Sequence, residues 1–229
     1  MSKIAVCLSG RARLVRRSME FVRGLADNYV TMVFMHFWEE SPSIRNQSWS
    51  KALIADSDIM LLRKCAGQSD RFRYMQERFC VLEHKFEEYR KTIKSEAFFN
   101  RWDVGIISMY YSMNQADVMR QEYEQATSTK FNCVIRARFD SEPQKPFNLY
   151  EYNMDFLHIP SPEYDCGGIN DRFAFGGSEV MSTYSSVVHH IKEHAEKVGY
   201  QPEAILKSHL MKNDLCHGRI RRPDYLVLT

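Results

Sequence analysis

The segment "KIAVCLSGRARLVRRSMEFVRGLADNYVTMVFMHFW", residues 3–38, decides the expected fold because its hydrophobic pattern changes twice. Residues 3–10 form a short apolar run closed by Ser-Gly, which is typical of a buried strand and its turn. Apolar side chains then recur at helical spacing at Leu14, Val15, Met19, Val22 and Leu25. Residues 28–38 return to β-branched and aromatic side chains. This order of strand, helix and strand favours a parallel sheet with helices on its faces.

The rest of the chain continues the alternation of strands and helices. Residues 71–99 are rich in Glu, Lys, Arg and aromatics and contain no Gly or Pro, which indicates one long or two broken helices. A helix is expected from about residue 104, with one side traced by Ile107, Tyr111, Asn114, Val118 and Tyr123. Strands are expected within 131–139, 155–160 and 172–177, helices over about 178–198 and 202–212, and one more strand is possible at 57–65. Without an internal repeat or low-complexity linker, residues 1–229 are expected to form a single α/β domain with a mixed, mostly parallel sheet.

Composition excludes several classes of protein. With 44% hydrophobic and 26% charged residues, the chain is expected to be an ordinary globular protein. The 31 basic and 29 acidic residues leave a net charge of only +2, so no stable nucleic-acid partner is expected. No apolar run approaches the roughly 20 residues of a transmembrane helix, and a cytoplasmic location is expected. The six cysteines form no C-x-x-C pair, which favours buried reduced thiols over disulfides or a zinc site.

The segment "CVIRARFDSE", residues 133–142, combines a buried strand with charge at its end. Alternation along a strand puts Arg136 and Arg138 on one face, and guanidinium groups beside a sheet need anions, either carboxylates or a bound phosphate. Asp140 and Glu142 follow at the carboxyl end, where ligands of open α/β sheets gather. Two such carboxylates can hold Mg²⁺ or Mn²⁺. The alternative is an internal ion pair with the arginines and no ligand.

This segment resembles the D-x-D element of GT-A glycosyltransferases, in which a strand ends in acidic residues that bind the metal of a nucleotide-sugar donor. Here the second acidic position is Glu142 rather than Asp. Three further segments agree with the resemblance: "CLSGRAR" at 7–13, "ISMYYSMNQADVMRQEYE" at 107–124 and "CGGINDRFAFGG" at 166–177. Together they are similar to small glycosyltransferases of large DNA viruses and of bacterial polysaccharide clusters, which would place a viral member in the host cytoplasm. The resemblance implies a GT-A, Rossmann-like fold, a nucleoside-diphosphate sugar donor, a glycan or glycoconjugate acceptor, and Mn²⁺ or Mg²⁺ as cofactor.

The resemblance and the residue chemistry together assign candidate roles. The donor is expected to contact the first turn, where Gly10 permits close approach and arginines pair with phosphate, and the motif strand. These donor-binding candidates are Ser9, Gly10, Arg11, Arg13, Arg136 and Arg138. The metal candidates are Asp140, Glu142 and, because several GT-A families add a late histidine, His209, with His217 as the other choice. Asp171 is the first choice for the base that deprotonates the acceptor hydroxyl, and Asp165 is the second.

Other interpretations stay open. The first turn also fits a surface turn before a basic helix, and the two aspartates also fit turn caps. His190 and His194 are one helical turn apart, yet the surrounding Lys and Glu favour a solvated helix face over zinc. A sugar nucleotidyltransferase, or another metal-dependent nucleotide enzyme, is the first alternative function. The second is a non-catalytic module that binds glycan or nucleic acid through "GRIRRP".

Overall fold

The computed structural model describes residues 2–10, 15–38, 74–80, 101–141, 148–160, 167–215 and 220–221. In this part of the chain, one seven-stranded mixed sheet forms the centre, with strand order β3-β2-β1-β4-β6-β5-β7. Its strands are β1 (Lys3–Gly10), β2 (Val30–Trp38), β3 (Tyr74–Cys80), β4 (Cys133–Arg138), β5 (Leu157–His158), β6 (Phe173–Gly176) and β7 (Ile220–Arg221).

Strand β6 runs opposite to both of its neighbours, and the strand order changes side at β1. Strands β3, β2, β1 and β4 are parallel neighbours, whereas β6 runs antiparallel to both β4 and β5. The chain adds β2 and β3 on one side of β1 and then returns to place β4 on the other side. The carboxyl ends of β1 and β4 therefore form a topological switch point, where open α/β sheets bind their ligands.

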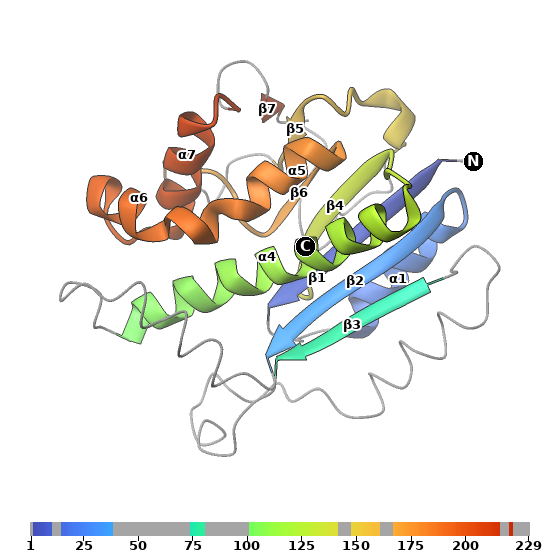
Figure 1. Cartoon of the computed structure of the whole chain (residues 1–229), viewed down its shortest axis with the longest axis horizontal. Coiled ribbons are helices and arrows are strands. Elements are labelled where there is room, and N and C mark those ends of the chain that lie inside the picture. The colour runs from blue at the N-terminus through green and yellow to red at the C-terminus, as the bar shows by residue number, and fades with distance from the viewer. Residues whose placement is uncertain are drawn as a thin grey trace.

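Helices cover both faces of the sheet, as Figure 1 shows. On one face lies α1 (Val15–Ala26). The other face carries α4 (Arg101–Thr127), and beyond it lie α5 (Ser178–Ser185), α6 (Ile191–Val198) and α7 (Pro202–Lys212). Two short 3-10 helices complete these elements, η2 (Leu149–Glu151) and η3 (Ser186–His190).

Alternation along the strands divides the core into two layers. In β1, Ile4, Val6 and Leu8 pack on the α1 side, with Val22 and Leu25 of α1. The side chains between them, Ala5 and Cys7, pack on the α4 side. The same division holds in β4, where Val134 belongs to the α4 layer and Ile135, Ala137 and Phe139 to the α1 layer. This confirms the expectation that Arg136 and Arg138 share the face of Val134.

Most of the expected elements in the described ranges are confirmed, including the strand, helix and strand order of residues 3–38 and the 202–212 helix. The expected helix over 71–99 is wrong at its start, because Tyr74–Cys80 is a strand. That segment pairs along its whole length with β2, from Met32↔Tyr74 to Trp38↔Cys80. Backbone pairing at the edge of the sheet outweighs a weak local helix preference. Residues 81–99 and the possible strand at 57–65 lie outside the described residues.

Helix α4 is buried more widely than a single apolar stripe predicts. Ile107, Tyr111 and Asn114 are buried as expected, but Val118 and Tyr123 are only partly buried. Charged Asp117, Arg120 and Glu124 are buried instead. The reason is that α4 lies between the sheet on one side and α5 and η3 on the other (Figure 1).

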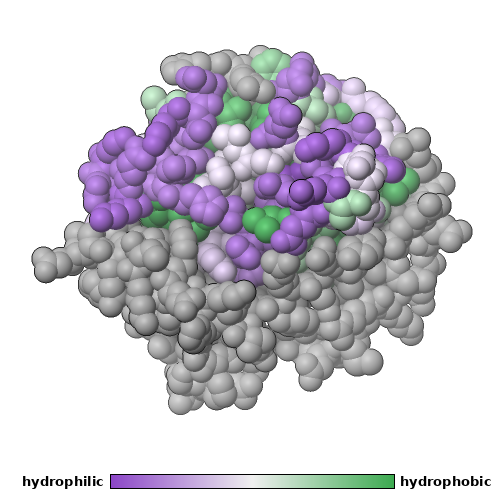
Figure 2. All heavy atoms as spheres, in the orientation of Figure 1, coloured by the Kyte–Doolittle hydropathy of each residue, from purple (hydrophilic) through white to green (hydrophobic). Residues whose placement is uncertain are grey.

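The cysteine expectation holds where it is tested, because Cys7 and Cys133 are buried free thiols. Burial raises the pKa of both thiols, so they are protonated and unreactive. Among the described helices, none has the length and apolar character needed to cross a membrane. Figure 2 shows that hydrophilic side chains dominate the described surface over α6 and α7.

Candidate functional site

The candidate site lies at the carboxyl ends of β1 and β4, which are paired in parallel. Register places Ser9 beside Arg138 and Cys7 beside Arg136. Strand β1 ends at Gly10, whose φ of +108° lies in the region that favours glycine, although a Cβ there would meet no atom within 4 Å. The backbone conformation, rather than a lack of space for a side chain, therefore explains why glycine occupies position 10. The hydroxyl of Ser9 is buried and has no hydrogen-bond partner among the described residues.

Ser112 of α4 fixes the end of β1. Its Oγ accepts a hydrogen bond from the Gly10 amide at 2.9 Å and donates one to the carbonyl oxygen of His36 at 2.9 Å. The Nδ1 atom of His36 also lies 2.8 Å from this hydroxyl. One buried side chain thus joins the ends of β1 and β2 to the helix above them. Ser112 interrupts the apolar pattern of its helix, and that interruption is the sequence signal for this role.

Arg138 and Asp140 form a bidentate ion pair at the exit of β4. The Nε atom of Arg138 donates to Asp140 Oδ1 at 2.9 Å, and Nη2 donates to Oδ2 at 2.8 Å. Burial lowers the pKa of Arg138, but the hydrogen bond and the charge of Asp140 outweigh it and raise that pKa. Both side chains remain partly exposed. The ion pair expected as one interpretation of this motif is thus present between Arg138 and Asp140, while Glu142 lies outside the described residues.

Arg136 has a different environment from Arg138. Its side chain is 1% exposed, and Nε, Nη1 and Nη2 are all buried without a hydrogen-bond partner in the described part of the chain. Burial lowers the pKa of Arg136, and nearby Tyr184 and Asp171 partly offset that effect. The guanidinium therefore lies close to the charge of Asp171 without bonding to it.

Residues 167–172 lead into β6 beside the end of β4. The amide of Ile169 donates to the carbonyl oxygen of Glu203 at 3.0 Å, at the first turn of α7. Gly168 is required at this approach, because a Cβ would lie 2.2 Å from the Glu203 carbonyl carbon. The amide of Arg138 donates to the carbonyl oxygen of Arg172 at 2.9 Å. These contacts hold the loop against both β4 and α7.

Asp171 is the acidic residue that this loop brings to the site. It is 5% exposed, and its carboxylate has no hydrogen bond to another described residue. The two residues that flank it are bonded at the site: the Arg172 carbonyl accepts from the Arg138 amide, and the Asn170 carbonyl accepts from the Tyr184 hydroxyl. The charge of Asp171 acts on the pKa of Arg136, Arg138 and Tyr110. The structure therefore brings together the predicted base and the two arginines of the motif strand.

His209 lies in another part of the fold. Its Nε2 lies 2.9 Å from the carbonyl oxygen of Thr183 and 3.2 Å from Ser186 Oγ. Its ring stacks on His190 and meets His194 edge-on. Within the described residues, all these contacts belong to α5, η3 and α6, which gives His209 a packing role between helices. His194 is buried, contrary to the expected solvated face, whereas His190 is exposed as expected.

The described residues fit a divalent cation only in part. Asp140 supplies a carboxylate, but both of its oxygens face Arg138. No group of three His, Cys, Asp or Glu side chains arranged for a metal occurs in the described ranges. Several predicted site residues lie outside these ranges and have no structural account: Arg11, Arg13, Glu142, Asp165 and His217.

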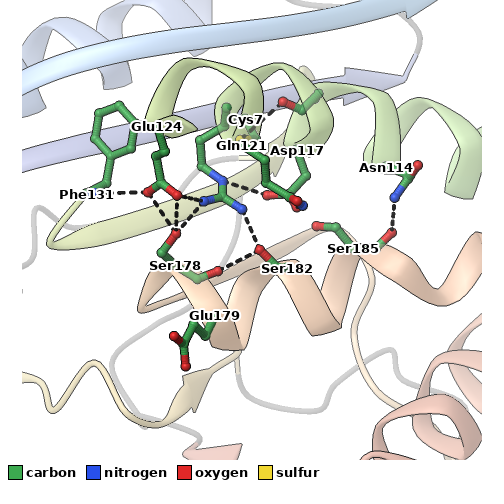
Figure 3. Close-up of polar contacts among 12 residues, drawn as sticks. Cys7, Asn114, Asp117, Gln121, Glu124, Phe131, Ser178, Glu179, Ser182 and Ser185 are labelled. Atoms are coloured by element: carbon green, nitrogen blue, oxygen red, sulfur yellow. Dashed lines mark hydrogen bonds and ion pairs between the residues drawn. The ribbon is translucent and has the colours of Figure 1, made fainter. Parts of the chain in front are cut away.

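A buried ionic network between α4 and α5 was not predicted from the sequence. Arg120 donates from Nε to Asp117 Oδ1 at 2.8 Å and from Nη1 to Glu124 Oε2 at 2.8 Å. It also donates to the hydroxyls of Ser178 and Ser182. Figure 3 shows Asp117 and Glu124 on one helix facing Ser178 and Ser182 on the other. The spacing Asp117-x-x-Arg120-x-x-x-Glu124 is a helical ion-pair pattern that could have indicated it.

The charged groups of this network are paired with one another, so the network has a structural role in holding α4 against α5. Burial raises the pKa of Asp117, although Arg120 opposes that rise. For Glu124, burial also acts to raise the pKa, but the Phe131 amide, Ser178 and Arg120 outweigh it and lower the pKa. Each charged group has a partner within the network, and every side-chain nitrogen of Arg120 donates to one of them or to a serine hydroxyl.

No protein-family model matches the chain, and no curated protein sequence matches it. The fold defines a protein of the α/β class with an open mixed sheet.

Proposed function

We propose that the protein is a GT-A glycosyltransferase that moves a sugar from a nucleoside-diphosphate sugar to a hydroxyl of a glycan or glycoconjugate. The observation that carries this proposal is the position of the Arg138–Asp140 pair, beside the Gly10 turn at the switch point of the sheet. An open α/β sheet binds nucleotides at such a point. Charged groups held there, on a rigid strand, suit a ligand that carries phosphates.

The donor diphosphate would lie against the first turn and Arg138. Gly10 allows the backbone to approach a ligand closely, and the unpartnered hydroxyl of Ser9 supplies a donor beside it. A planar guanidinium binds two phosphate oxygens at once, so Arg138 can exchange contacts with Asp140 for contacts with diphosphate. Arg11 and Arg13, predicted from the sequence, would add positive charge at the same turn.

Asp171 is the group best suited to activate the acceptor. In an inverting transfer, the acceptor oxygen forms a bond to the anomeric carbon as the bond from that carbon to the diphosphate breaks, and the hydroxyl proton moves to a carboxylate. Asp171 has no competing hydrogen bond among the described residues and lies near Arg136 and Arg138. Its carboxylate is therefore available to accept that proton.

The proposed cofactor, Mn²⁺ or Mg²⁺, would be held by Asp140 together with Glu142. Such a cation supplies positive charge that neutralises the departing diphosphate. Of these two carboxylates, only that of Asp140 belongs to a described residue. Arg138 would therefore bind phosphate whether or not a cation is present.

A thermal-shift screen of nucleoside diphosphates and their sugars, with and without Mn²⁺, tests the proposal. A selective rise in Tm with one base is expected, because a ligand that binds the native state stabilises it. Release of nucleoside diphosphate from the selected donor then measures turnover. The proposal fails if no donor is consumed and pyrophosphate is instead released from a nucleoside triphosphate and a sugar phosphate. Salt-sensitive polymer binding without turnover would equally contradict it.

A further inference from the structure

Two arginines in the described part of the chain are equally buried and differ in their partners. Arg120 is 0% exposed and donates to Asp117, Glu124, Ser178 and Ser182. Arg136 is 1% exposed, and none of its three side-chain nitrogens has a hydrogen-bond partner among the described residues. At similar burial, all three side-chain nitrogens of Arg120 donate hydrogen bonds and none of those of Arg136 donates one to a described residue.

A buried guanidinium without partners is costly. Its five N–H donors have left water, and an unsatisfied buried donor loses its hydration without a replacement, which costs more when the group is charged. A protein core can replace such a group with an apolar side chain of similar size at little cost or with a gain in stability. The presence of arginine at position 136 is therefore explained most directly by an anion that binds there.

The surroundings of Arg136 identify the side of the site from which this anion comes. In the sheet, Arg136 lies between Cys7 of β1 and Ala174 of β6. It is one pleat repeat, about 7 Å, before Arg138 on the same face. The hydroxyl of Tyr184 donates to the carbonyl oxygen of Asn170 at 3.3 Å, next to Asp171, the residue proposed to activate the acceptor. Tyr184 and Asp171 are also the two groups that most strongly oppose the effect of burial on the pKa of Arg136. Arg138, which is paired with Asp140, is the arginine already assigned to the donor diphosphate.

We propose that Arg136 binds an oxyanion carried by the acceptor, so that the substrate of this site is an acidic glycan. The planar fork of the guanidinium fits two oxygens of a carboxylate or of a phosphate monoester. Either group can be carried by a sugar, and the shared chemistry is a flat or tetrahedral oxyanion next to the reacting hydroxyl. That the anion belongs to the acceptor rests on the proposed function, whereas the anion site itself rests on the burial and missing partners of Arg136.

The experiment compares Arg136→Met with the matched variant Arg120→Met by thermal unfolding. Without ligand, Arg136→Met is expected to be as stable as the unaltered protein or more stable, because an unpartnered buried charge is removed. Arg120→Met is expected to have a lower Tm, because it strands Asp117 and Glu124 without their partner. Met approximates the length of arginine and limits the cavity left behind.

Three probes identify the ligand: glucuronate carries a carboxylate, glucose 6-phosphate carries a phosphate, and glucose is the neutral control. One of the two anionic sugars is expected to raise the Tm of the unaltered protein, while glucose does not. Arg136→Met is expected to weaken that binding by about tenfold or more, and Arg136→Lys to weaken it less, because Lys keeps the charge but loses the fork. Arg120→Met retains the shift relative to its own Tm.

Two results would overturn the proposal. The first is that neither anionic sugar raises the Tm of the unaltered protein, or that Arg136→Met shows the same rise in Tm. The other is a large loss of stability in both Arg136→Met and Arg136→Lys without ligand, which would mean that the chain itself supplies the partner. Donor turnover is measured separately. If sugar transfer occurs but no anionic sugar binds at Arg136, this inference fails and the proposed function stands. If an anionic sugar binds at Arg136 but no sugar transfer is found, the proposed function fails and the anion site stands.

Discussion

Arg138 contacts both carboxylate oxygens of Asp140, two residues further along the chain, through hydrogen bonds of 2.9 and 2.8 Å. The pair holds the exit of β4 beside the Gly10 turn of β1, because Arg138 is in register with Ser9. It neutralises a charge that burial would otherwise penalise, and it keeps that charge available at the point where a phosphate would bind.

Asp140→Ala is expected to abolish sugar transfer while leaving the fold intact. Arg138 keeps 33% of its side chain exposed, so water can replace the lost carboxylate, and the cost in stability should stay within about 1 kcal/mol. Transfer rates at saturating donor, together with Tm, measure the two effects. Full turnover in this variant would remove Asp140 from the proposed mechanism.

Ser112→Ala is expected to lower the free energy of unfolding by about 1–3 kcal/mol, because the partly buried Gly10 amide and the buried His36 carbonyl lose their shared partner. Thr127→Ala is the control on the same helix, since its exposed hydroxyl bonds, among the described residues, to the Tyr123 carbonyl alone, and its effect should be within about 0.5 kcal/mol. Denaturant unfolding compares them. Equal effects would show that Ser112 does not hold the turn.

Gly168→Ala is expected to destabilise the protein by about 2 kcal/mol or more, because its Cβ would lie 2.2 Å from the Glu203 carbonyl carbon. Backbone atoms must then separate, and the bond from Ile169 to Glu203 is lost. Gly24→Ala is the matched control. It lies exposed within α1, no atom is within 4 Å of its Cβ position, and the change should stabilise the helix by up to about 1 kcal/mol. Chemical denaturation should therefore show opposite signs.

Stability is expected to fall as the pH drops from about 6.5 to about 4, in part because of His209. Burial lowers the pKa of His209 from 6.5 to about 4, so the folded state keeps this ring neutral while the unfolded chain takes up a proton. The stabilising effect is complete above the unfolded pKa and is lost as the pH falls toward the folded value, by about 3 kcal/mol at most.

Unfolding free energies at several pH values between 7 and 4 measure this dependence. His209→Gln should flatten the curve over this window. His194 also has a pKa lowered by burial and should account for part of what remains. An unchanged slope in His209→Gln would show that this ring does not carry the effect.

Much of the fold was predictable from local patterns. The β1, α1 and β2 elements follow from changes of hydrophobic period between residues 3 and 38, and the two faces of β4 follow from simple alternation. Strand β3 was not predictable in this way. Its sequence "YMQERFC" lacks a clear strand pattern, and pairing with β2 at the sheet edge decides its conformation.

The candidate site shows the same division. The sequence by itself determined that two arginines share a face and that Asp140 follows at the strand exit, because a strand has a period of two. Only the tertiary structure decided that Arg138 meets Asp140 while Arg136 is buried near Asp171 without a bond to it. The physical reason is that burial and hydrogen bonding depend on what other segments bring, and here α4, α5 and residues 167–172 come from distant parts of the chain.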